Sequence, residues 1–506
     1  MVFASYIQLD YISFIVEIFL FILSIVLLMF GVFIVSLRNY KYITLVRELQ
    51  YFLILAFGFS LMLLYETPLS TQVVFNNLLC IDPLVLTVKF ILILTTICCL
   101  IISFNYIKNE RISLFEYNIL ILLAILGLIC FISAYDLVSF YLALELQSLS
   151  FYILASFKKD SAFSTEAGLK YFILGALSSG FLLFGMALIY GAVGSTNFEV
   201  ILKSIIMVDP NNIFYDAFSG RVIIGSVFIL ISVLFKLTAA PFHMWAPDVY
   251  EGAPTPISAL FASVPKLGLF LILIKFFYIL FYDLIFFWQN EVLLCSLLSV
   301  LVGTFSALRQ TKIKRFLAFS SVTHVGFLLI AFSTGTLEGI SSLFFYMFIY
   351  IIMTLNAWSI VLFLEYRKKG SRLRYITDLQ NLSKTHPMIA FTLAMNLFSM
   401  AGVPPLAGFF AKMYVFFSGL EVSLNLVVII GIIISVISAF YYLRFIKLMY
   451  FDGINQGYMF ISTKSDTGLV YLLGLTFFVI VFLFINPNFL ILFTESLGVF
   501  LFSSMC

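Results

Sequence analysis

Long apolar runs recur from one end of this sequence to the other, and they constrain the fold more than any other feature. The chain has 506 residues, of which 63% are hydrophobic and only 10% are charged. A water-soluble protein of this length would need a far more polar surface. An apolar run of about 20 residues is long enough for a helix to cross a bilayer. The composition therefore predicts an all-α polytopic membrane protein.

We predict about fourteen transmembrane helices joined mostly by short loops. Their approximate bounds are residues 12–37, 50–66, 84–105, 114–134, 137–156, 166–192, 221–245, 254–281, 287–307, 315–334, 341–364, 388–417, 424–450 and 467–494. Lysine and arginine gather in alternate loops, most densely after spans nine and eleven. Because basic loops stay on the inner side of a membrane, both termini are predicted on the outer side.

Two of the predicted spans contain helix-breaking prolines near a lysine. In span seven Pro241 lies five residues after Lys236, and in span twelve the sequence AGVPPLAGFFAK ends at Lys412. A proline inside a helix removes one hydrogen bond and clashes with the carbonyl four residues before it. We therefore expect freed backbone carbonyls near Leu237, Met400 and Ala401. Broken helices at membrane depth are tolerated where they line a cavity or are buried in protein.

The spacing of the two breaks predicts an internal repeat. The breaks are five spans apart, and a five-span unit repeated in tandem must be inverted because five is odd. Inverted repeats of spans 4–8 and 9–13 are a device of transporters. Two unrelated proline kinks are the alternative. The predicted organisation is a three-helix segment (1–110), a first half (111–285), a second half (286–452) and a C-terminal helix 14 (453–506).

Ionisable residues inside the apolar spans are the candidate functional residues. A charge at mid-bilayer costs about 2.5–3.5 kcal/mol on insertion scales, so such groups face the bundle interior and mark ion or proton paths. Lys236 lies near the centre of span seven. Glu145 shares one face of span five with Tyr141, Ser148 and Tyr152. The alternative for Glu145 is a buried carboxyl that is satisfied by hydrogen bonds and only packs.

Glu145 and Lys236 are predicted to form a switchable pair. Burial destabilises the charged form of a lysine, and a nearby carboxylate stabilises it. A change in their separation would therefore release or take up a proton, and the pair would titrate as a unit. Such a pair is able to move protons without any redox group.

Further buried groups extend this pair into a predicted proton relay. Lys266 lies about midway into span eight, and the alternative for it is a side chain that reaches the membrane surface. His324 is surrounded by serine and threonine and can pass protons on either ring nitrogen, although a packed hydrogen-bonding histidine is the alternative. Lys412 follows the second break.

Three other lysines are weaker candidates. Lys170 lies four residues after Glu166, so a local ion pair is the plain interpretation, with a relay role as the alternative. Lys89 and Lys275 lie nearer the ends of their spans, and both are interpreted as reaching the membrane surface.

Composition and motifs exclude several other functions. The six cysteines form no Cys-x-x-Cys pair, and the three histidines are scattered, so no metal or redox centre is expected on this chain. There is no phosphate loop and no Rossmann fingerprint. The net charge is only +3 and no basic cluster lies on a soluble face, so no nucleic-acid partner is expected.

Four stretches of the sequence resemble a known family. LELQSLSFYILA, FHMWAPDVYEGAPT, VPKLGLF and AGVPPLAGFFAK are similar to antiporter-like subunits of NADH:ubiquinone oxidoreductase (respiratory complex I), and most to subunit 2 of the mitochondrially encoded plant and protist type. The resemblance runs from about residue 135 to 452. It implies an antiporter-like fold in which Glu145, Lys236, Lys266 and Lys412 take the family's proton-carrying positions in helices five, seven, eight and twelve.

The resemblance also implies a setting in the mitochondrial inner membrane. Proton pumping would be driven by NADH oxidation and ubiquinone reduction elsewhere in the complex, where NADH, FMN, iron–sulfur clusters and ubiquinone bind; this chain would bind no cofactor. The implied partners are neighbouring membrane-arm subunits of the subunit 4 and subunit 4L types, supernumerary subunits and lipids such as cardiolipin. The alternatives are a subunit of a multi-subunit cation/proton antiporter and a structural subunit whose channel has lapsed.

Overall fold

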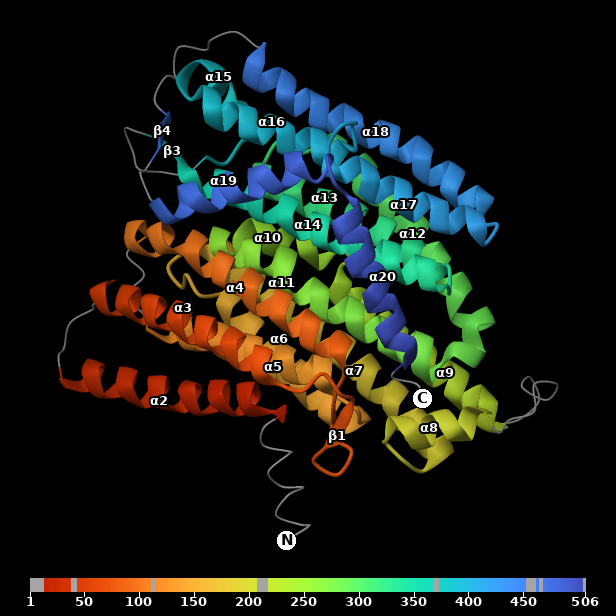
Figure 1. The fold of residues 1–506 in the computed structure, drawn as a ribbon. Coiled ribbons are helices and arrows are strands. Elements are labelled where there is room, and N and C mark those ends of the chain that lie inside the picture. Colours follow the sequence, from red (N-terminus) through yellow and green to blue (C-terminus); the bar gives the residue numbers. More distant parts are fainter. Residues whose placement is uncertain are drawn as a thin grey trace.

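The computed structural model is mostly helical, as predicted, with two short antiparallel strand pairs that the all-α prediction did not include. It describes residues 13–37, 43–110, 115–206, 217–366, 373–451, 461–463 and 467–503. Some basic loop residues behind the predicted orientation lie outside these ranges, namely Arg38, Lys41, Arg111, Arg367, Lys368, Lys369 and Arg372. The described helices run roughly side by side as a slanted bundle (Figure 1).

Twelve helices of the described chain are long and apolar enough to cross a membrane. They are α2 (Ile15–Leu37), α3 (Ile43–Glu66), α4 (Pro83–Asn109), α5 (Glu116–Ser133), α6 (Leu137–Ala155), α7 (Ala162–Val193), α9 (Ala217–Leu237), α11 (Thr255–Ile274), α12 (Ile285–Leu308), α13 (Ile313–Ser333), α14 (Leu337–Phe363) and α18 (Asn425–Tyr450). α11 continues into a π-helical turn, η1 (Lys275–Leu280). These twelve correspond to predicted spans one to eleven and thirteen.

The remaining elements are shorter. They are α8 (Phe198–Ile206), α10 (Trp245–Gly252), α15 (Leu382–Thr385), α16 (Pro387–Ala401), α17 (Ala407–Glu421), α19 (Thr467–Phe482), α20 (Asn488–Ser503), the 3-10 turns η2 (Tyr282–Leu284) and η3 (Ile376–Leu379), and strands β1 (Gln72–Val74), β2 (Leu79–Ile81), β3 (Leu364–Tyr366) and β4 (Ile461–Thr463). β1 pairs antiparallel with β2, and β3 with β4. Predicted span twelve is divided between α16 and α17. Predicted span fourteen covers α19 and the start of α20, so the count of fourteen stays a prediction.

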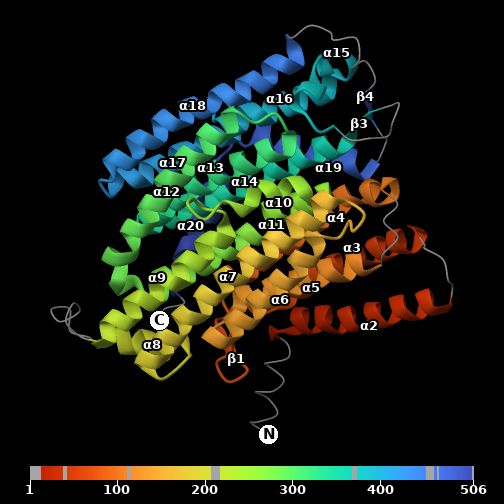
Figure 2. The same ribbon diagram turned by 180° about the vertical axis from the view of Figure 1, so that it is seen from behind.

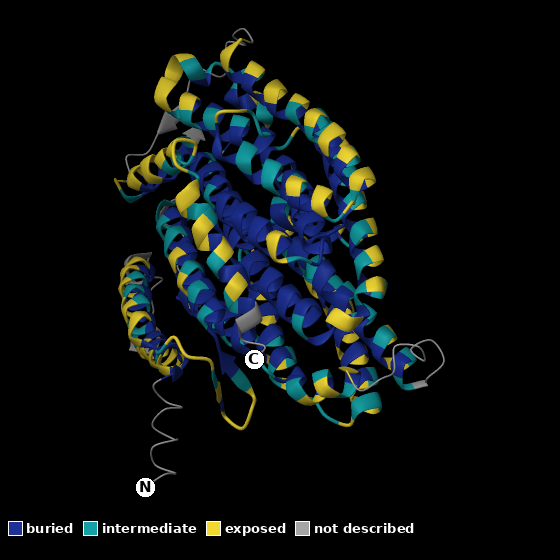
Figure 3. Ribbon diagram, turned by 45° about the vertical axis from the view of Figure 1, so that its right-hand side comes forward, coloured by how far each residue is buried: buried dark blue, intermediate teal, exposed yellow. Residues whose placement is uncertain are grey.

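The most buried helices lie at the centre of the bundle. Every residue of α11 is buried, and α13 and α14 are buried along most of their length (Figure 3). α2 and α3 lie at one edge and α18 at the opposite edge, seen from both sides in Figures 1 and 2. The outer helices expose large apolar side chains such as Phe21, Met62 and Phe440. An apolar exterior around a buried core is the arrangement of a protein whose outer surface faces lipid.

The two ends of the bundle differ in their elements. The β1–β2 hairpin and α8 lie at one end, and α15 with the β3–β4 pair lies at the other (Figure 1). Lys158, Lys312 and Arg374 line a cavity of about 430 Å³ together with Thr255, the first residue of α11. Because these cations belong to the basic loops, this end is the predicted inner side and the hairpin end is the predicted outer side.

Both predicted helix breaks are present. α9 ends at Leu237 and α10 begins at Trp245, while α16 ends at Ala401 and α17 begins at Ala407. Thr238 and Gly402, directly after the two helix ends, have φ angles of +67° and +84°. Left-handed backbone at these two positions turns the chain out of the helix.

Gly408 allows α16 and α17 to cross at very short range. A Cβ atom on Gly408 would lie 1.9 Å from the Ser399 carbonyl oxygen, which is backbone of α16. We predict that Gly408→Ala lowers the free energy of unfolding by about 1–3 kcal/mol, because the added methyl group forces backbone to move. The measurement is thermal denaturation in detergent.

Gly180 in α7 provides the matched control. A Cβ on Gly180 would meet no neighbouring atom of the described chain within 4 Å. Gly180→Ala should therefore be neutral or slightly stabilising, since alanine favours a helix over glycine by about 1 kcal/mol. Equal loss of stability in the two variants would contradict a close crossing at Gly408.

Candidate functional site

Lys236 lies two residues before the first helix break. Its Nζ atom is buried and makes no hydrogen bond to another described residue. Thr238 is β-branched, and positive φ in such a residue costs of order 1–3 kcal/mol. The surrounding structure holds the break in place through Trp245, whose Nε1 donates to the Phe235 carbonyl at 3.0 Å. The Phe235 carbonyl, two residues before the expected Leu237, accepts this bond in addition to one from the Thr238 backbone N–H at 3.1 Å, so it is not a freed carbonyl.

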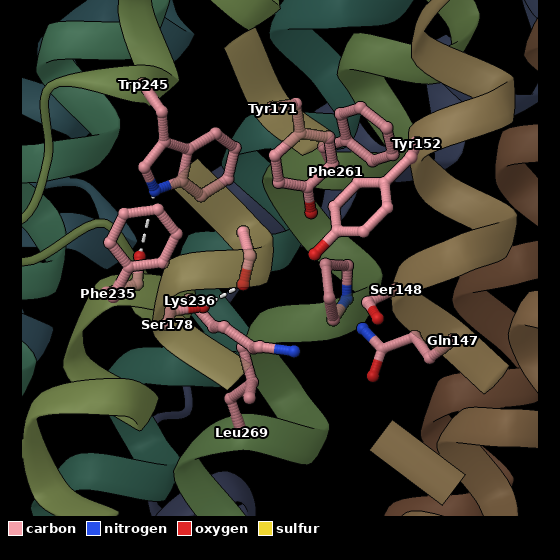
Figure 4. A pocket seen from close by; sticks show the side chains of 12 residues that line it. Gln147, Ser148, Tyr152, Tyr171, Ser178, Phe235, Lys236, Trp245, Phe261 and Leu269 are labelled. Atoms are coloured by element: carbon pink, nitrogen blue, oxygen red, sulfur yellow. Dashed lines mark hydrogen bonds between the residues drawn. The ribbon is translucent and has the colours of Figure 1, made fainter. Parts of the chain in front are cut away.

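Lys236 borders a small cavity between four transmembrane helices and α10. The cavity has a volume of about 20 Å³. Its lining residues are Gln147, Ser148, Tyr152, Tyr171, Gly175, Ser178, Phe235, Lys236, Trp245, Phe261, Pro265 and Leu269. Figure 4 shows the Lys236 amine pointing into this space on the side of Gln147 and Ser148. A polar space of this size has room for about one water molecule.

Glu145 approaches this cavity from α6. Its Oε2 atom accepts a hydrogen bond from Ser148 Oγ at 3.2 Å, and its buried Oε1 atom has no partner in the described chain. Within the described residues Glu145 and Lys236 form no direct ion pair at 4.0 Å or less. The two predicted partners are therefore connected through Ser148 and the cavity rather than by a direct contact.

The central helices bring Lys266 and His324 together through tyrosine hydroxyls. Lys266 Nζ donates to the Tyr350 hydroxyl at 2.8 Å, and the Tyr350 ring lies 5.3 Å from the His324 ring. His324 Nδ1 is 2.8 Å from the Tyr346 hydroxyl, and its Nε2 is 3.4 Å from the Tyr442 hydroxyl. All five side chains are buried. They come from α11, α13, α14 and α18, so distant parts of the sequence build one polar centre.

These three tyrosines were not predicted as site residues. Tyr346 and Tyr350 lie four residues apart on α14, which places them on one helix face. The chain contains 27 tyrosines, however, so this spacing alone carried no usable signal.

Lys412 binds the backbone at the second break. Its Nζ atom donates to the Ala401 carbonyl at 2.8 Å and lies 5.2 Å from the centre of the Phe327 ring. The expectation of a freed carbonyl near Ala401 is confirmed. A Cβ atom on Gly402 would lie 2.9 Å from Lys412 Cδ. Glycine is therefore required here twice, for the positive φ angle and for the path of the lysine side chain.

Lys170 lies apart from this row, in a partly exposed ionic network. Its Nζ atom is 2.7 Å from Glu166 and 2.9 Å from Asp248. Arg315 binds the other oxygen of Asp248 at 3.0 Å. The local Lys170–Glu166 pair is confirmed, and Asp248 of α10 extends it to α13.

Two lysines that were expected at the membrane surface are buried instead. Lys89 forms an ion pair with Glu17, and Lys275 lies 3.4 Å from Asp82. Both ammonium groups are enclosed, with 1% and 6% of the residue surface exposed. The expectation was wrong because each lysine pairs with a carboxylate that is distant in the sequence. Residue spacing within a single span cannot predict such a partner.

Comparison with known proteins gives a consistent picture. The family described as NADH:quinone oxidoreductase/Mrp antiporter, TM matches residues 134–438. "NADH-ubiquinone oxidoreductase chain 2" of Marchantia polymorpha is 44% identical over 491 residues, which is 97% of this chain and 98% of that protein. The matched range includes all five residues of the predicted relay.

Solved structures share the fold. A chain of respiratory complex I from Thermus thermophilus, solved with bound aureothin, superimposes with a TM-score of 0.74 at 25% identity, covering 94% of this chain and 98% of the other. A chain of the Mrp complex from Dietzia sp. DQ12-45-1b gives a TM-score of 0.77 at 16% identity, with 97% of both chains covered. At that level of identity the second likeness concerns the fold alone.

The hydroxyl of Tyr350 is the hydrogen-bond partner of Lys266, and its removal tests their contact. We predict that Tyr350→Phe lowers the free energy of unfolding by about 1–3 kcal/mol, because it leaves a buried amine without its acceptor. Tyr471→Phe is the control, because it removes the same hydroxyl group from a side chain that is 77% exposed. Thermal denaturation in detergent measures both. Equal stability of the two variants would contradict the contact.

Proposed function

The chain belongs to the subunit 2 family of NADH:quinone oxidoreductase, respiratory complex I, and from this premise we propose that it translocates protons across the membrane within that complex. It is a multi-pass membrane subunit of an NADH:quinone reductase, and other complex I subunits are its partners. The proposed path runs through Glu145, Lys236, Lys266, His324 and Lys412.

One observation carries this proposal: protonatable side chains touch one another in the most buried part of the bundle. Lys266 donates to Tyr350, the Tyr350 ring packs on His324, and His324 binds a second tyrosine. Amines and imidazoles at this depth are costly, and they are rare unless they serve a transport path or relay. Packing alone would be served better by apolar side chains of similar volume.

The first half of the proposed path works as a switch. Lys236 borders a space for about one water, and Ser148, which lines the same space, donates a hydrogen bond to Glu145. When the carboxylate comes closer, the protonated form of Lys236 is stabilised; when it withdraws, burial favours loss of the proton. The helix break beside Lys236 supplies a segment whose position is not fixed by regular helical hydrogen bonds.

Local similarities support the proposed inverted repeats of spans 4–8 and 9–13, in residues 111–285 and 286–452. Each break has a residue of positive φ followed three positions later by proline, at Thr238 and Gly402. Gly127 of α5 packs against the backbone of Gln147 in α6, and Gly303 of α12 packs in the same way against Thr323 in α13. Residues 1–110 and 453–506 would flank the two halves.

The redox cofactors and substrates of the complex are proposed to bind to other subunits. We assign NADH, FMN, iron–sulfur clusters and ubiquinone to other subunits, and we place the chain in the mitochondrial inner membrane by its likeness to the Marchantia protein. Neighbours of the subunit 4 and 4L types, supernumerary subunits and lipids such as cardiolipin are the proposed contacts of its apolar outer faces. The alternative, a subunit of a cation/proton antiporter, has weaker support: the matching family also includes Mrp antiporter subunits, and the Mrp complex shares the fold.

Replacement of Lys236 tests the relay. In complex reconstituted into liposomes, Lys236→Ala should slow NADH-driven proton transport through this chain by at least about tenfold, because a positioned proton-transfer group typically contributes about 10²–10⁴-fold. Lys203→Ala is the control, because Lys203 is an exposed lysine of α8. Internal pH is followed with a trapped dye. Undiminished transport in Lys236→Ala would remove the proposed role.

The antiporter alternative predicts a different driving force. Under the proposed function, proton movement requires NADH and quinone and continues without a sodium gradient. Proton movement that needs sodium and ignores NADH would identify the chain as part of a cation/proton antiporter. Both conditions are measured on the same liposomes with the same dye.

A further inference from the structure

A second buried acid–base group lies on α11, away from the row described above. Lys275 follows Lys266 by nine residues, which is about 13 Å along a helix. It begins the π-helical turn η1, and π-turns within helices are frequent at functional sites. Since Thr255 at the other end of α11 lies with the basic loops, Lys275 lies on the predicted outer side.

The Lys275 ammonium is held between a carboxylate and a carbonyl. Its Nζ atom is 3.4 Å from Asp82 Oδ2 and 3.4 Å from the Ile132 carbonyl oxygen. Both distances exceed the 2.7–2.9 Å or so of a strong charge-assisted hydrogen bond. The lysine is thus shared between two acceptors, and Asp82 is not locked to it by a short contact.

Asp82 is aimed at this pair rather than at its own helix. It is the N-cap residue of α4, followed by Pro83, yet its side chain makes no capping hydrogen bond. Oδ1 accepts instead from Cys80 Sγ at 3.1 Å. Burial raises the pKa of the Cys80 thiol to about 12, so at neutral pH the thiol is a proton donor to Asp82 and carries no charge.

A half-buried pair links this group to the surface. The Tyr135 hydroxyl donates to Glu199 Oε1 at 3.2 Å, between the start of α6 and α8. Tyr135 lies against the β1–β2 hairpin that precedes Asp82, because its backbone N–H donates to the Leu78 carbonyl at 2.9 Å. Burial and the neighbouring Glu199 carboxylate raise the pKa of Tyr135, so its hydroxyl keeps its proton at neutral pH. The other buried ammonium near Cys80 is Lys89, which is paired with Glu17.

The segment between the two lysines is apolar. Residues 267–274 of α11 are apolar or glycine, and all of them are buried. Hydrophobic constrictions of this kind gate conduction by excluding water. A proton on Lys266 therefore cannot leak continuously toward Lys275, and transfer needs transient wetting of this segment.

We propose that Asp82 and Lys275 form a proton-release branch on the outer side, which leaves the proposed path at Lys266 and has Tyr135 and Glu199 as its exit to solvent. This rests on the proposed function. A proton that crosses the apolar segment binds the Asp82 carboxylate, which frees Lys275 to turn to the Ile132 carbonyl. Asp82 then loses the same proton toward Tyr135, Glu199 and solvent, and the ion pair forms again. No electron moves and no covalent bond other than those to the proton changes.

Substitution of Asp82 by asparagine tests the release site in the intact complex. Asparagine has nearly the same shape as aspartate and is about equally favoured at a helix N-cap, but its side chain does not take up a proton. Asp82→Asn should slow NADH-driven proton release by at least about tenfold. Glu17→Gln is the matched control, because Glu17 is also a buried carboxylate paired with a lysine. Equal transport in Asp82→Asn and in the unsubstituted complex would overturn the proposal.

A second variant covers the case in which Asp82→Asn does not assemble. Asp82→Glu keeps a titratable carboxyl but moves it by one methylene, so it should retain transport with a shifted pH profile. An unchanged pH profile would assign Asp82 a structural role only and overturn the proposal. Lys236→Ala separates the two claims: transport blocked by Lys236→Ala but not by Asp82→Asn rejects the release site alone, whereas transport untouched by both rejects the proposed function.

Discussion

The free-energy cost of burying a charged or polar group is the constraint on which this structure depends. The chain places Lys236, Lys266 and Lys412 inside an apolar bundle, where each needs an environment that offsets lost hydration. Two are satisfied by single oxygen acceptors, the Tyr350 hydroxyl and the Ala401 carbonyl, together with aromatic rings. Lys236 instead borders a cavity. Among the described residues, none of these three lysines forms a salt bridge with a carboxylate. No paired negative charge therefore fixes any of them in its protonated form.

The helix breaks follow from the same constraint. Ending a helix inside the bundle leaves carbonyls without partners, and here side chains beyond the break supply the donors. Trp245 donates to Phe235 at the first break, and Lys412 donates to Ala401 at the second. At the second break the donor, Lys412, is itself a residue of the proposed relay. The helix break and the proposed proton-carrying group are thus in direct contact there. At the first break the donor is Trp245, and the Lys236 amine makes no hydrogen bond to a described residue.

Sequence reasoning succeeded where the physical signal is local. Hydropathy placed the long helices, and proline placed both breaks, because each depends on residues that are adjacent in the chain. It failed where partners come from elsewhere. Lys89 and Lys275 were assigned to the membrane surface, since Glu17 and Asp82 cannot be paired with them by helical spacing. The predicted Glu145–Lys236 pair is not in direct contact. The separation of the two groups depends on side-chain rotamers and on the cavity beside Lys236, which helical spacing does not reveal.

Aligning the two proposed repeats, residues 111–285 and 286–452, separates what the fold would supply from what the side chains supply. With Thr238 matched to Gly402, Asp248 occupies the position of Lys412. Asp248 is a partly exposed carboxylate bound to Lys170 and Arg315, whereas Lys412 is buried.

The α5–α6 and α12–α13 helix pairs show a second position at which the two proposed repeats carry different side chains. With Gln147 matched to Thr323, Ser148 occupies the position of His324. The first proposed repeat therefore carries Lys236 at a cavity and Glu145 hydrogen-bonded to Ser148 of its lining, and the second carries His324 among tyrosines and Lys412 at the helix break. A repeated backbone with identical charges would give a row whose two ends are electrostatically alike. Because the matched positions of the proposed repeats hold different groups, we infer that any direction of proton movement comes from the side chains and not from the shared backbone.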